Sequence, residues 1–461
     1  MTGWSAKAFA ERVSRRRFLG GSAAAAVGAW SAGAFGTAVL SGQGRGRGNA
    51  PPAPTLASLK TMDPNDEAFW RVIRREYNIA DGMTYMNNGT LGPMPRPVID
   101  ANMRYLREAA EDPHALPSIE PVRQKMAAFI GADPDEVVLN RSTTEGMKQF
   151  TAGLDLKAGD EILMSTHEHG GGRDPWRARE KRHGLKVVEV AVPAPAESVD
   201  QIVSLFEKAI TPRTRVLMVS HISFVTGLVS PIKALAEMAH RKGLLFSVDA
   251  AHALGMLDLN MHDYGIDHYS AAGQKWLMAG TGNGVAYFKK DIQDRVWSDM
   301  ASANDNATQG ARKYERSGQR NIPSALGMGD AVDFQMTIGK KTVEARVKQL
   351  ATRVRSGIKD IPGGKVFTPM SPELSAGLTT FSIREVPKAV VTKVLMDKYG
   401  IYIPASGFND FSCRVSTHVY TMQADVDRFL AGVRDISDNA AKYTTSTAPA
   451  APARDDFDQA D

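Results

Sequence analysis

The sequence predicts an α/β protein, in which helices cover a mostly parallel sheet and a smaller α+β domain follows. Three observations support this. Strand-like segments alternate with helical ones of ten or more residues between Glu136 and His252, as expected for parallel strands joined by crossover helices. Beyond about Pro323 long helical stretches replace the alternation. A chain of 461 residues, 43% of them apolar and 23% charged, is long enough for two such domains.

The elements of the first domain follow in order. The expected strands are 136–140, 160–166, 186–192, 215–222, 244–252 and one more within 264–273; the expected helices are 142–154, 174–184, 199–210 and 230–243. Ile202, Leu205 and Phe206 fall on one face of the third helix. The fourth helix begins with Ser-Pro and ends at Gly243, which are helix start and stop signals.

The second domain is predicted to contain one long helix, two strands and two further helices. Their expected ranges are 325–358 for the long helix, 378–385 and 413–420 for the strands, and 390–399 and 423–438 for the shorter helices. We therefore expect a large domain at 106–324 and a small domain at 325–440, with residues 63–105 packing against the small domain. The Ala-, Thr- and Asp-rich tail 441–461 is expected to be disordered.

The N-terminus is predicted to be an export signal. The segment SRRRFLG contains the twin-arginine pair Arg15 and Arg16, and an uncharged, Ala- and Gly-rich run follows from Phe18 to Leu40. Such a weakly apolar run is typical of a twin-arginine signal at 1–42, although it is long enough to be an uncleaved membrane anchor. A flexible linker is expected at 43–62. The protein should therefore interact with the twin-arginine export machinery and be periplasmic or otherwise extracytoplasmic.

Charge and cysteine content agree with this interpretation. The net charge of +5 comes from seven basic residues against one acid before residue 48, so the rest of the chain is close to neutral and no nucleic-acid partner is expected. The single cysteine, Cys413, excludes an internal disulfide. This fits a protein that folds in the cytoplasm before export.

Two residues indicate the chemistry. Asp249 ends the strand-like run LFSVD, where α/β sheets bind ligands. Lys275 lies 26 residues later among small residues in SAAGQKWL. Pyridoxal phosphate forms a Schiff base with a lysine and needs an acid beside its ring nitrogen. The alternative is an Asp that caps a helix and a Lys that faces solvent.

Around these two residues the sequence resembles the class V aminotransferase family of fold-type I pyridoxal-phosphate enzymes, and most closely its isopenicillin N epimerase-like group. The similar motifs are SVDAAHALGMLDL and YSAAGQKWL around Asp249 and Lys275, together with YMNNGTLGPMPRPV, NRSTTEGM, THEHGGG, SHISFVTGLVSPIKAL and CRVSTHVYTMQADVDRFL, and they span about 63–438. The resemblance implies a pyridoxal-phosphate enzyme acting on an amino acid, and a homodimer.

The resemblance also implies roles for individual residues near the cofactor ring. Lys275 would hold the cofactor as a Schiff base and move the proton at Cα, and Asp249 would pair with the pyridinium nitrogen. His252 matches the residue beside the ring hydroxyl. His169 matches the residue that stacks on the ring, with His167 as a second candidate.

Further roles concern the phosphate and the substrate. Thr144 and the amide of Glu145 begin a helix and would bind the phosphate. Arg414 matches the arginine that clamps a substrate carboxylate. Asn88 is a second candidate for substrate binding.

The sequence departs from the family pattern at four positions. Gln274 replaces the usual His before the lysine, and Ala272 replaces a Ser of the desulfurases, which leaves Ser270 as the nearest hydroxyl. Gln319 occupies the position of a threonine that reaches the partner's phosphate, and Phe224 replaces an Asn. The phosphate site is therefore expected to be rebuilt around Ser270, Gln274 and Gln319.

The reaction type stays open at this stage. Cysteine desulfurases use a cysteine on the loop before the arginine, but the loop 404–411 has none, and strand alternation points Cys413 away from Arg414. Transamination, epimerisation and Cβ elimination at an amino acid all remain, with Lys275 as the base. A non-catalytic protein with this fold is a further alternative, and Lys275, Asp249 and Arg414 together argue against it.

Overall fold

The computed structural model describes residues 54–299, 310–315 and 318–444. The expected signal at 1–42, most of the linker at 43–62 and the tail beyond 444 lie outside the described residues. The end of the expected linker, Leu56–Thr61, is a 3-10 helix (η2) that buries Leu59. Helix α14 (Ala440–Thr444) continues the chain into the segment expected to be disordered. Among the residues described, none of the helices combines the length and apolar character that crossing a membrane requires.

A seven-stranded sheet forms the centre of the large domain. Its order is β2-β8-β7-β6-β5-β3-β4, with strands β2 (Val137–Asn140), β3 (Glu161–Ser165), β4 (Lys186–Val190), β5 (Thr214–Ser220), β6 (Leu245–Asp249), β7 (His268–Ala272) and β8 (Gly284–Phe288). Strands β4, β3, β5, β6 and β7 run parallel, and β8 is antiparallel to both of its neighbours. The predicted mostly parallel α/β fold is therefore confirmed.

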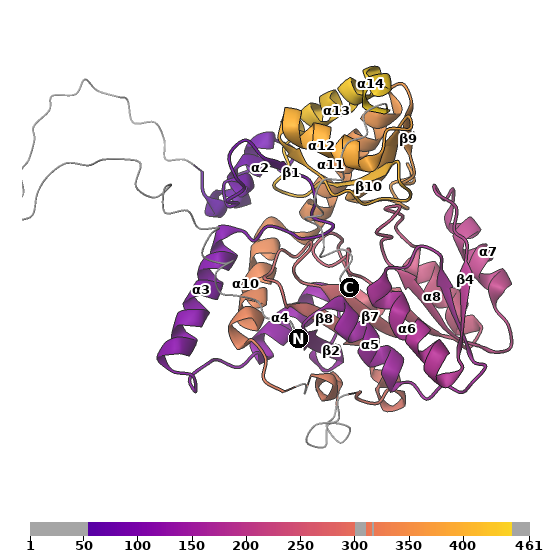
Figure 1. The fold of residues 1–461 in the computed structure, drawn as a ribbon. Helices are drawn as coiled ribbons and strands as arrows, with labels where there is room; N and C mark the ends of the chain where they lie inside the picture. Colours follow the sequence, from indigo (N-terminus) through magenta and orange to yellow (C-terminus); the bar gives the residue numbers. More distant parts are fainter. Residues whose placement is uncertain (1–53, 300–309, 316–317, 445–461) are drawn as a thin grey trace, which may run out of the picture. The chain divides into compact units, whose positions relative to one another are not determined.

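Helices connect and cover these strands (Figure 1). They are α5 (Thr143–Gly153), α6 (Gly170–His183), α7 (Val199–Ala209), α8 (Ile232–Arg241) and the short α9 (Met261–Tyr264). The 3-10 turns η3 (Pro134–Glu136), η4 (Lys290–Arg295) and η6 (Ala311–Tyr314) complete the large domain. Ile202 and Phe206 on the predicted face of α7 are buried, whereas Leu205 is half-buried.

Strand β8 has no counterpart among the elements expected from the sequence. It lies between the turn-rich segment 278–283 and the polar residues 289–291, and all five of its residues are buried. A short strand that is buried on both faces has no polar alternation, so the pattern gives little signal.

The small domain contains a three-stranded sheet of order β12-β10-β9, formed by β9 (Gly364–Val366), β10 (Leu378–Ile383) and β12 (Ser412–Ser416). Helices α11 (Lys340–Lys359), α12 (Lys388–Tyr399) and α13 (Gln423–Asp438) pack with it around one apolar core. The single helix expected at 325–358 is two helices, α10 (Ile322–Ile338) and α11. Gly339 separates them at a φ of 94°, which favours glycine.

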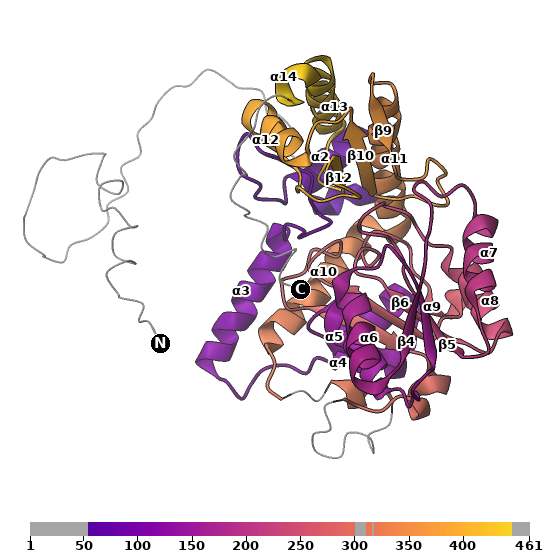
Figure 2. The same ribbon diagram turned by 45° about the vertical axis from the view of Figure 1, so that its right-hand side comes forward.

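The N-terminal segment contacts both domains. Helix α2 (Glu67–Arg74) joins the small domain through an ion pair between Glu67 and Arg346 of 2.6 Å, and β1 (Thr84–Tyr85) pairs with β11 (Ile401–Tyr402). Helix α3 (Arg96–Glu111) lies beside α10 (Figure 2), and α4 (Glu120–Ile130) packs on α10 as well. The loop 86–95 between β1 and α3 contacts the Lys275 loop through the amide of Gly92 and strand β12 through the amide of Gly89.

Candidate active site

Asp249 ends β6 at the carboxyl edge of the parallel sheet. It is almost fully buried, and one carboxylate oxygen accepts the amide of Ala251 at 3.0 Å. Burial raises the pKa of Asp249, while positive charge on His169, the Ala251 amide and the charge of Lys275 act in the opposite direction. The structure thus brings together Asp249, His169 and Lys275, as the sequence predicts.

The loop that carries Lys275 is held by its backbone. Three successive carbonyls accept hydrogen bonds from distant segments: that of Gln274 from the amide of Gly92 at 2.9 Å, that of Lys275 from Asn88 Nδ2 at 3.0 Å, and that of Trp276 from His418 Nε2 at 2.8 Å. Gln335 Nε2 also donates to the Trp276 carbonyl, at 3.1 Å. A lysine on a loop fixed in this way has a defined position at its Cα.

Close approach explains the glycine at position 92. A Cβ there would lie 2.0 Å from the Lys275 carbonyl oxygen, so any side chain would displace the lysine loop. Two residues past Trp276, Met278 has a φ of 61°, a strained conformation for a residue with a side chain. These features indicate that close contacts fix the backbone conformation of the loop around Lys275.

Asn88 is fully buried, and both ends of its amide are engaged. Besides its bond to the Lys275 carbonyl, its Oδ1 accepts the Tyr420 hydroxyl at 2.6 Å. Substrate binding by Asn88 stays a prediction, and the contacts seen here make it a positioning residue for the lysine loop.

His252 lies beneath the same loop. The indole N–H of Trp276 donates to its Nδ1 at 3.2 Å. Burial lowers the pKa of His252 well below its usual range, and the nearby charges of Lys275, Arg414 and His169 lower it further. A neutral ring whose Nδ1 accepts must carry its proton on Nε2, so His252 can donate one hydrogen bond, as its predicted place beside the ring hydroxyl requires.

Helix α5 begins at the carboxyl end of β2 with Ser142 as its N-cap. The amide of Glu145 donates to Ser142 Oγ at 3.1 Å, and the Glu145 carboxylate accepts the Arg141 amide at 2.6 Å. The Glu145 amide therefore already has a partner within the chain, and its role in phosphate binding stays a prediction. The Thr144 hydroxyl lies at this helix start, facing Gly171.

His169 is the N-cap of α6, and its Nδ1 accepts the Gly171 amide at 3.0 Å. Its ring meets that of Phe224 edge-to-face, with centroids 4.9 Å apart. His167 has a different environment. Its ring is buried against Phe408, at a centroid distance of 5.7 Å. Of the two histidines, His169 is the one whose charge acts on Asp249, which agrees with its preferred assignment.

The glycines after His169 leave space between α5, α6 and β6. A Cβ on Gly171 would lie 2.5 Å from Thr144 Oγ1, and one on Gly172 would lie 2.7 Å from Asp249 Oδ2. Backbone amides at two helix starts thus adjoin a hydroxyl and a buried carboxylate, which is an arrangement suited to an anionic ligand that also carries a cationic group.

Ser270 and Gln274 complete the expected phosphate side. Ser270 is fully buried in β7, and its hydroxyl donates to the Thr143 carbonyl at 2.9 Å, so it joins β7 to the start of α5. Gln274 Oε1 is buried and has no hydrogen-bond partner among the described residues. A buried amide in this state is suited to a ligand contact.

Arg414 lies in β12 with 2% of its surface exposed. Its Nη2 donates to Thr90 Oγ1 at 2.8 Å and its Nη1 to the Phe224 carbonyl at 3.4 Å. A Cβ on Gly89 would lie 3.2 Å from the guanidinium carbon. The N-terminal loop and the small domain therefore position this guanidinium together, and its charge acts on His252.

Cys413 occupies the opposite face of β12, as alternation predicts. It is fully buried in the apolar core of the small domain, and burial raises the pKa of its thiol to about 12. A thiol in this environment is not a nucleophile at neutral pH.

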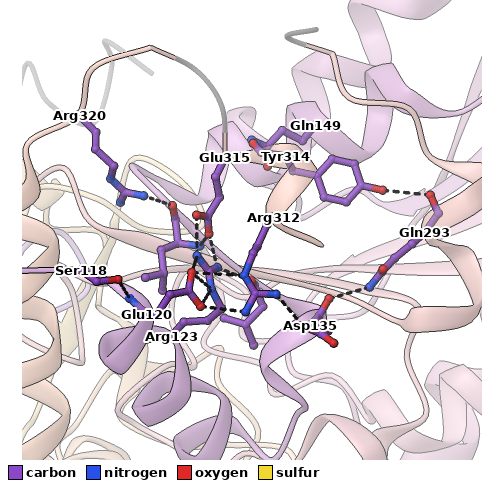
Figure 3. A network of polar contacts seen from close by, with 12 residues as sticks. Ser118, Glu120, Arg123, Asp135, Gln149, Gln293, Arg312, Tyr314, Glu315 and Arg320 are labelled. Atoms are coloured by element: carbon purple, nitrogen blue, oxygen red, sulfur yellow. Dashed lines mark hydrogen bonds and ion pairs between the residues drawn. The ribbon is translucent and has the colours of Figure 1, made fainter. Parts of the chain in front are cut away.

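Gln319 is exposed and follows an anchored segment. In the network of Figure 3, the Glu315 carboxylate pairs with the buried Arg123 and accepts the amide of Leu139 in β2. Arg320 donates to the carbonyl of the same leucine at 2.7 Å. Both sides of Gln319 are thus attached to the edge strand that leads into α5.

Comparisons with known proteins identify the family. The family model for aminotransferase class-V matches residues 84–429. The chain belongs to the class-V aminotransferase family. It is 31% identical to an isopenicillin N epimerase of Amycolatopsis lactamdurans over 80% of this chain and 98% of that protein, and 29% identical to one of Streptomyces clavuligerus over 78% and 96%.

Solved structures support the fold. The cysteine desulfurase CsdA of Escherichia coli matches with a TM-score of 0.70 at 23% identity, over 83% of this chain and 99% of that one. The cystine C–S lyase C-DES matches with a TM-score of 0.70 at 22% identity, over 77% and 98%. The fold is fold-type I, and this class-V enzyme is pyridoxal-phosphate-dependent.

The described residues fit that cofactor. Asp249 would supply the acid for a ring nitrogen and His252 a donor for a ring hydroxyl, and the space at Gly171 and Gly172 would admit the group. The sequence analysis missed His418 and Gln335, which hold the Trp276 carbonyl. Both look like ordinary core positions, since their function depends on contacts between segments far apart in the chain.

Proposed function

We propose that this enzyme moves a proton at the Cα of an amino acid, with Lys275 as the base and Arg414 as the binding group for the substrate carboxylate. The observation that carries the proposal is the division of β12 into two faces. Arg414 lies on the face near His252 and Lys275, whereas Cys413, the only cysteine of the chain, is sealed in the core.

The absence of a usable thiol argues against persulfide chemistry. Cys413 is buried with a raised pKa, and the loop 404–411 contains no cysteine. A desulfurase needs a thiolate that can reach the substrate sulfur. Reactions at Cα need only a base, a cofactor and a fixed substrate orientation.

Each residue of the site then has a defined task. Pyridoxal phosphate, when bound, supplies the electron sink for the Cα carbanion. Asp249 holds a negative charge at the ring nitrogen, and Arg414 orients the substrate through its carboxylate. Lys275 takes the Cα proton and can return one only to the face on which its amine lies, so inversion at Cα would need a second acid on the opposite face. The rigid backbone around Lys275 keeps its amine on one side of the substrate.

Epimerisation and transamination both remain within this proposal. Similarity to two isopenicillin N epimerases favours the first. The two differ in the outcome at Cα: an epimerase delivers a proton to the opposite face of Cα, whereas a transaminase removes the amino group and needs a 2-oxo acid to complete the cycle. Cβ elimination would differ again, because it requires a leaving group at Cβ.

The test uses a panel of amino acids in deuterated water, with and without a 2-oxo acid. The expected result is deuterium at Cα in the wild type and none in Lys275→Ala. Inverted, deuterated product without the 2-oxo acid indicates epimerisation, and amino-group transfer that depends on the 2-oxo acid indicates transamination. Absence of Cα exchange for every amino acid, in protein with bound cofactor, would contradict the proposal and favour a non-catalytic protein.

We also propose that the active protein is a homodimer in which Gln319 reaches the partner's phosphate site. The support is that Gln319 is exposed, while Glu315 and Arg320 on either side of it are anchored to β2. Analytical ultracentrifugation should give a dimer at assay concentration. An active monomer would contradict this.

Export is a separate proposal that rests on the sequence of residues 1–42. We propose that the twin-arginine route carries the folded protein with its cofactor to an extracytoplasmic location. Replacing Arg15 and Arg16 by Lys should retain it in the cytoplasm. Unchanged export of that variant would contradict the proposal, and export without cleavage would favour the anchored form.

A further inference from the structure

Glu168 is a buried carboxyl beside the cofactor site that the functions assigned above do not use. It lies in the turn between β3 and α6, directly before His169, with 5% of its surface exposed. Its two oxygens contact the hydroxyls of Ser165, at the end of β3, and of Ser220, at the end of β5 and 2.6 Å away. Glu168 therefore joins the His169 turn to two neighbouring strands.

This carboxyl lies next to Asp249. Ser220, its partner on β5, is opposite Asp249 in the register of β5 and β6. The two acids thus adjoin the same point of the sheet edge, and the charge of Asp249 acts on Glu168. Two carboxylates so placed in a buried site resist ionising together.

Glu168 forms no ion pair with a described residue, within 54–299, 310–315 and 318–444. The titratable groups on the elements packed around it are His167 and His169 of its own turn, His221 after β5 and Asp249 of β6. Burial lowers the pKa of both His167 and His221, so neither supplies a positive charge at neutral pH.

The two serine contacts are compatible with a neutral acid. Ser165 Oγ already accepts the amide of His167 at 3.1 Å, so its own proton can go to one oxygen of Glu168. Ser220 Oγ can then accept the acid proton from the other oxygen, because a hydroxyl both donates and accepts. Both carboxyl oxygens therefore have a partner in the neutral form; when the serine hydroxyls donate instead, they lower the pKa of Glu168, and burial is the larger, opposing cause.

We propose that Glu168 is a positioning residue of the cofactor site: as an uncharged acid between Ser165 and Ser220, it fixes the turn of His169 and leaves Asp249 as the negative charge beneath the cofactor. Burial raises the pKa of Glu168 to about 7, which agrees with this geometry. The proposal rests on the proposed function in one respect: it requires that the protein binds the cofactor. It does not depend on which reaction the enzyme catalyses.

The test compares three variants of the full protein by cofactor dissociation constant and visible absorbance. Glu168→Gln keeps the shape and both hydroxyl contacts without a charge, and Glu168→Ala removes them. Glu161→Gln is the matched control, because Glu161 is equally buried at the other end of β3 but is paired with Arg213 at 2.7 Å. Equilibrium dialysis across neutral pH gives affinity without relying on turnover.

At acidic pH we expect Glu168→Gln to bind the cofactor within about threefold of the wild type, and Glu168→Ala to bind about 10- to 100-fold more weakly, as when a supporting hydrogen bond is lost. Above neutral pH, wild-type affinity should fall as Glu168 gains a charge near an anionic ligand. That fall should be absent in Glu168→Gln and present in Glu161→Gln.

Two results would overturn the proposal. If Glu168→Gln binds as weakly as Glu168→Ala at acidic pH, the residue acts as a carboxylate. If Glu168→Gln keeps the wild-type pH dependence, Glu168 does not titrate at the site. Neither result would bear on Cα exchange, so failure here is distinct from failure of the proposed function.

Discussion

Buried acids have different partners at the two ends of the parallel strands. At the amino ends, acids have permanent partners: Glu161 pairs with Arg213 at 2.7 Å, and Asp267 accepts the Phe246 amide at 2.8 Å and contacts His240 at 3.0 Å. At the carboxyl ends, Asp249 and Glu168 are buried without such ion pairs among the described residues.

The same strand shows the contrast most clearly. At its start, the Thr211 hydroxyl and Arg213 lower the pKa of Glu161; just beyond its end, burial raises the pKa of Glu168 to about 7. Charge at the amino ends contributes to folding, whereas we expect the buried acids at the carboxyl ends to serve ligand binding. Substitutions at the two ends should therefore affect different measurements.

The largest effect is expected for Asp249→Asn. It removes the negative charge beneath the ring nitrogen while keeping the size of the side chain, so kcat should fall about 100- to 1000-fold, as for loss of one preorganised electrostatic contact. The measurement is kcat for the best amino acid from the exchange panel, in protein whose cofactor content is confirmed by absorbance. A decrease in kcat of less than tenfold would mean that the negative charge of Asp249 does not contribute to catalysis.

The next effect concerns pH. Because the folded pKa of Glu168 is raised from 4.5 to about 7, the native state binds more protons than the unfolded state in this range, and Glu168 makes stability fall as pH rises from about 4.5 to about 7. The resulting decrease in the free energy of unfolding should approach about 3 kcal/mol. The free energy of unfolding in urea should fall between about pH 4.5 and about pH 7 in the wild type more steeply than in Glu168→Gln. The same pH dependence in both proteins would contradict the contrast between the two ends of the strands.

Arg414→Lys should lower kcat/KM for an amino acid about tenfold to 100-fold, because lysine keeps the charge but loses the planar two-point contact. Cofactor absorbance should be unchanged. The matching amine without a carboxylate provides the control, since its smaller kcat/KM should hardly change. An equal loss for both compounds would assign Arg414 a structural role.

Asp267→Asn is expected to have the smallest effect, and on a different quantity. The amide still accepts the Phe246 amide but loses its charge, so the free energy of unfolding should fall by about 1 kcal/mol and kcat should stay within twofold of the wild type. A large kinetic effect with intact stability would show that the amino ends also serve the site.

Much of this arrangement can be predicted from the sequence, because the alternating strands and helices place Asp249 at a strand end and motif resemblance places Lys275 beside it. The contacts that position the lysine loop cannot be predicted from the sequence. Gly92, Asn88 and His418 come from three distant segments and converge on successive carbonyls of the lysine loop. No local period or spacing encodes that convergence, since it depends on how the N-terminal loop and the small domain pack.

Glu168 illustrates a second limit. In the sequence it is one acid in THEHGGG, and its neighbour His169 has the recognisable role. Its burial and its two serine contacts, without an ion pair to any described residue, appear only when β3, β5 and β6 are assembled.

The central claim, that Lys275 holds the cofactor, is tested most directly by chemical trapping. Purified protein is reduced with borohydride and digested, and the pyridoxyl group is located by mass spectrometry. The expected result is one modified peptide containing Lys275, with no modified lysine in Lys275→Ala. A pyridoxyl group on another lysine of the wild type, or one retained in the variant, would contradict the assignment.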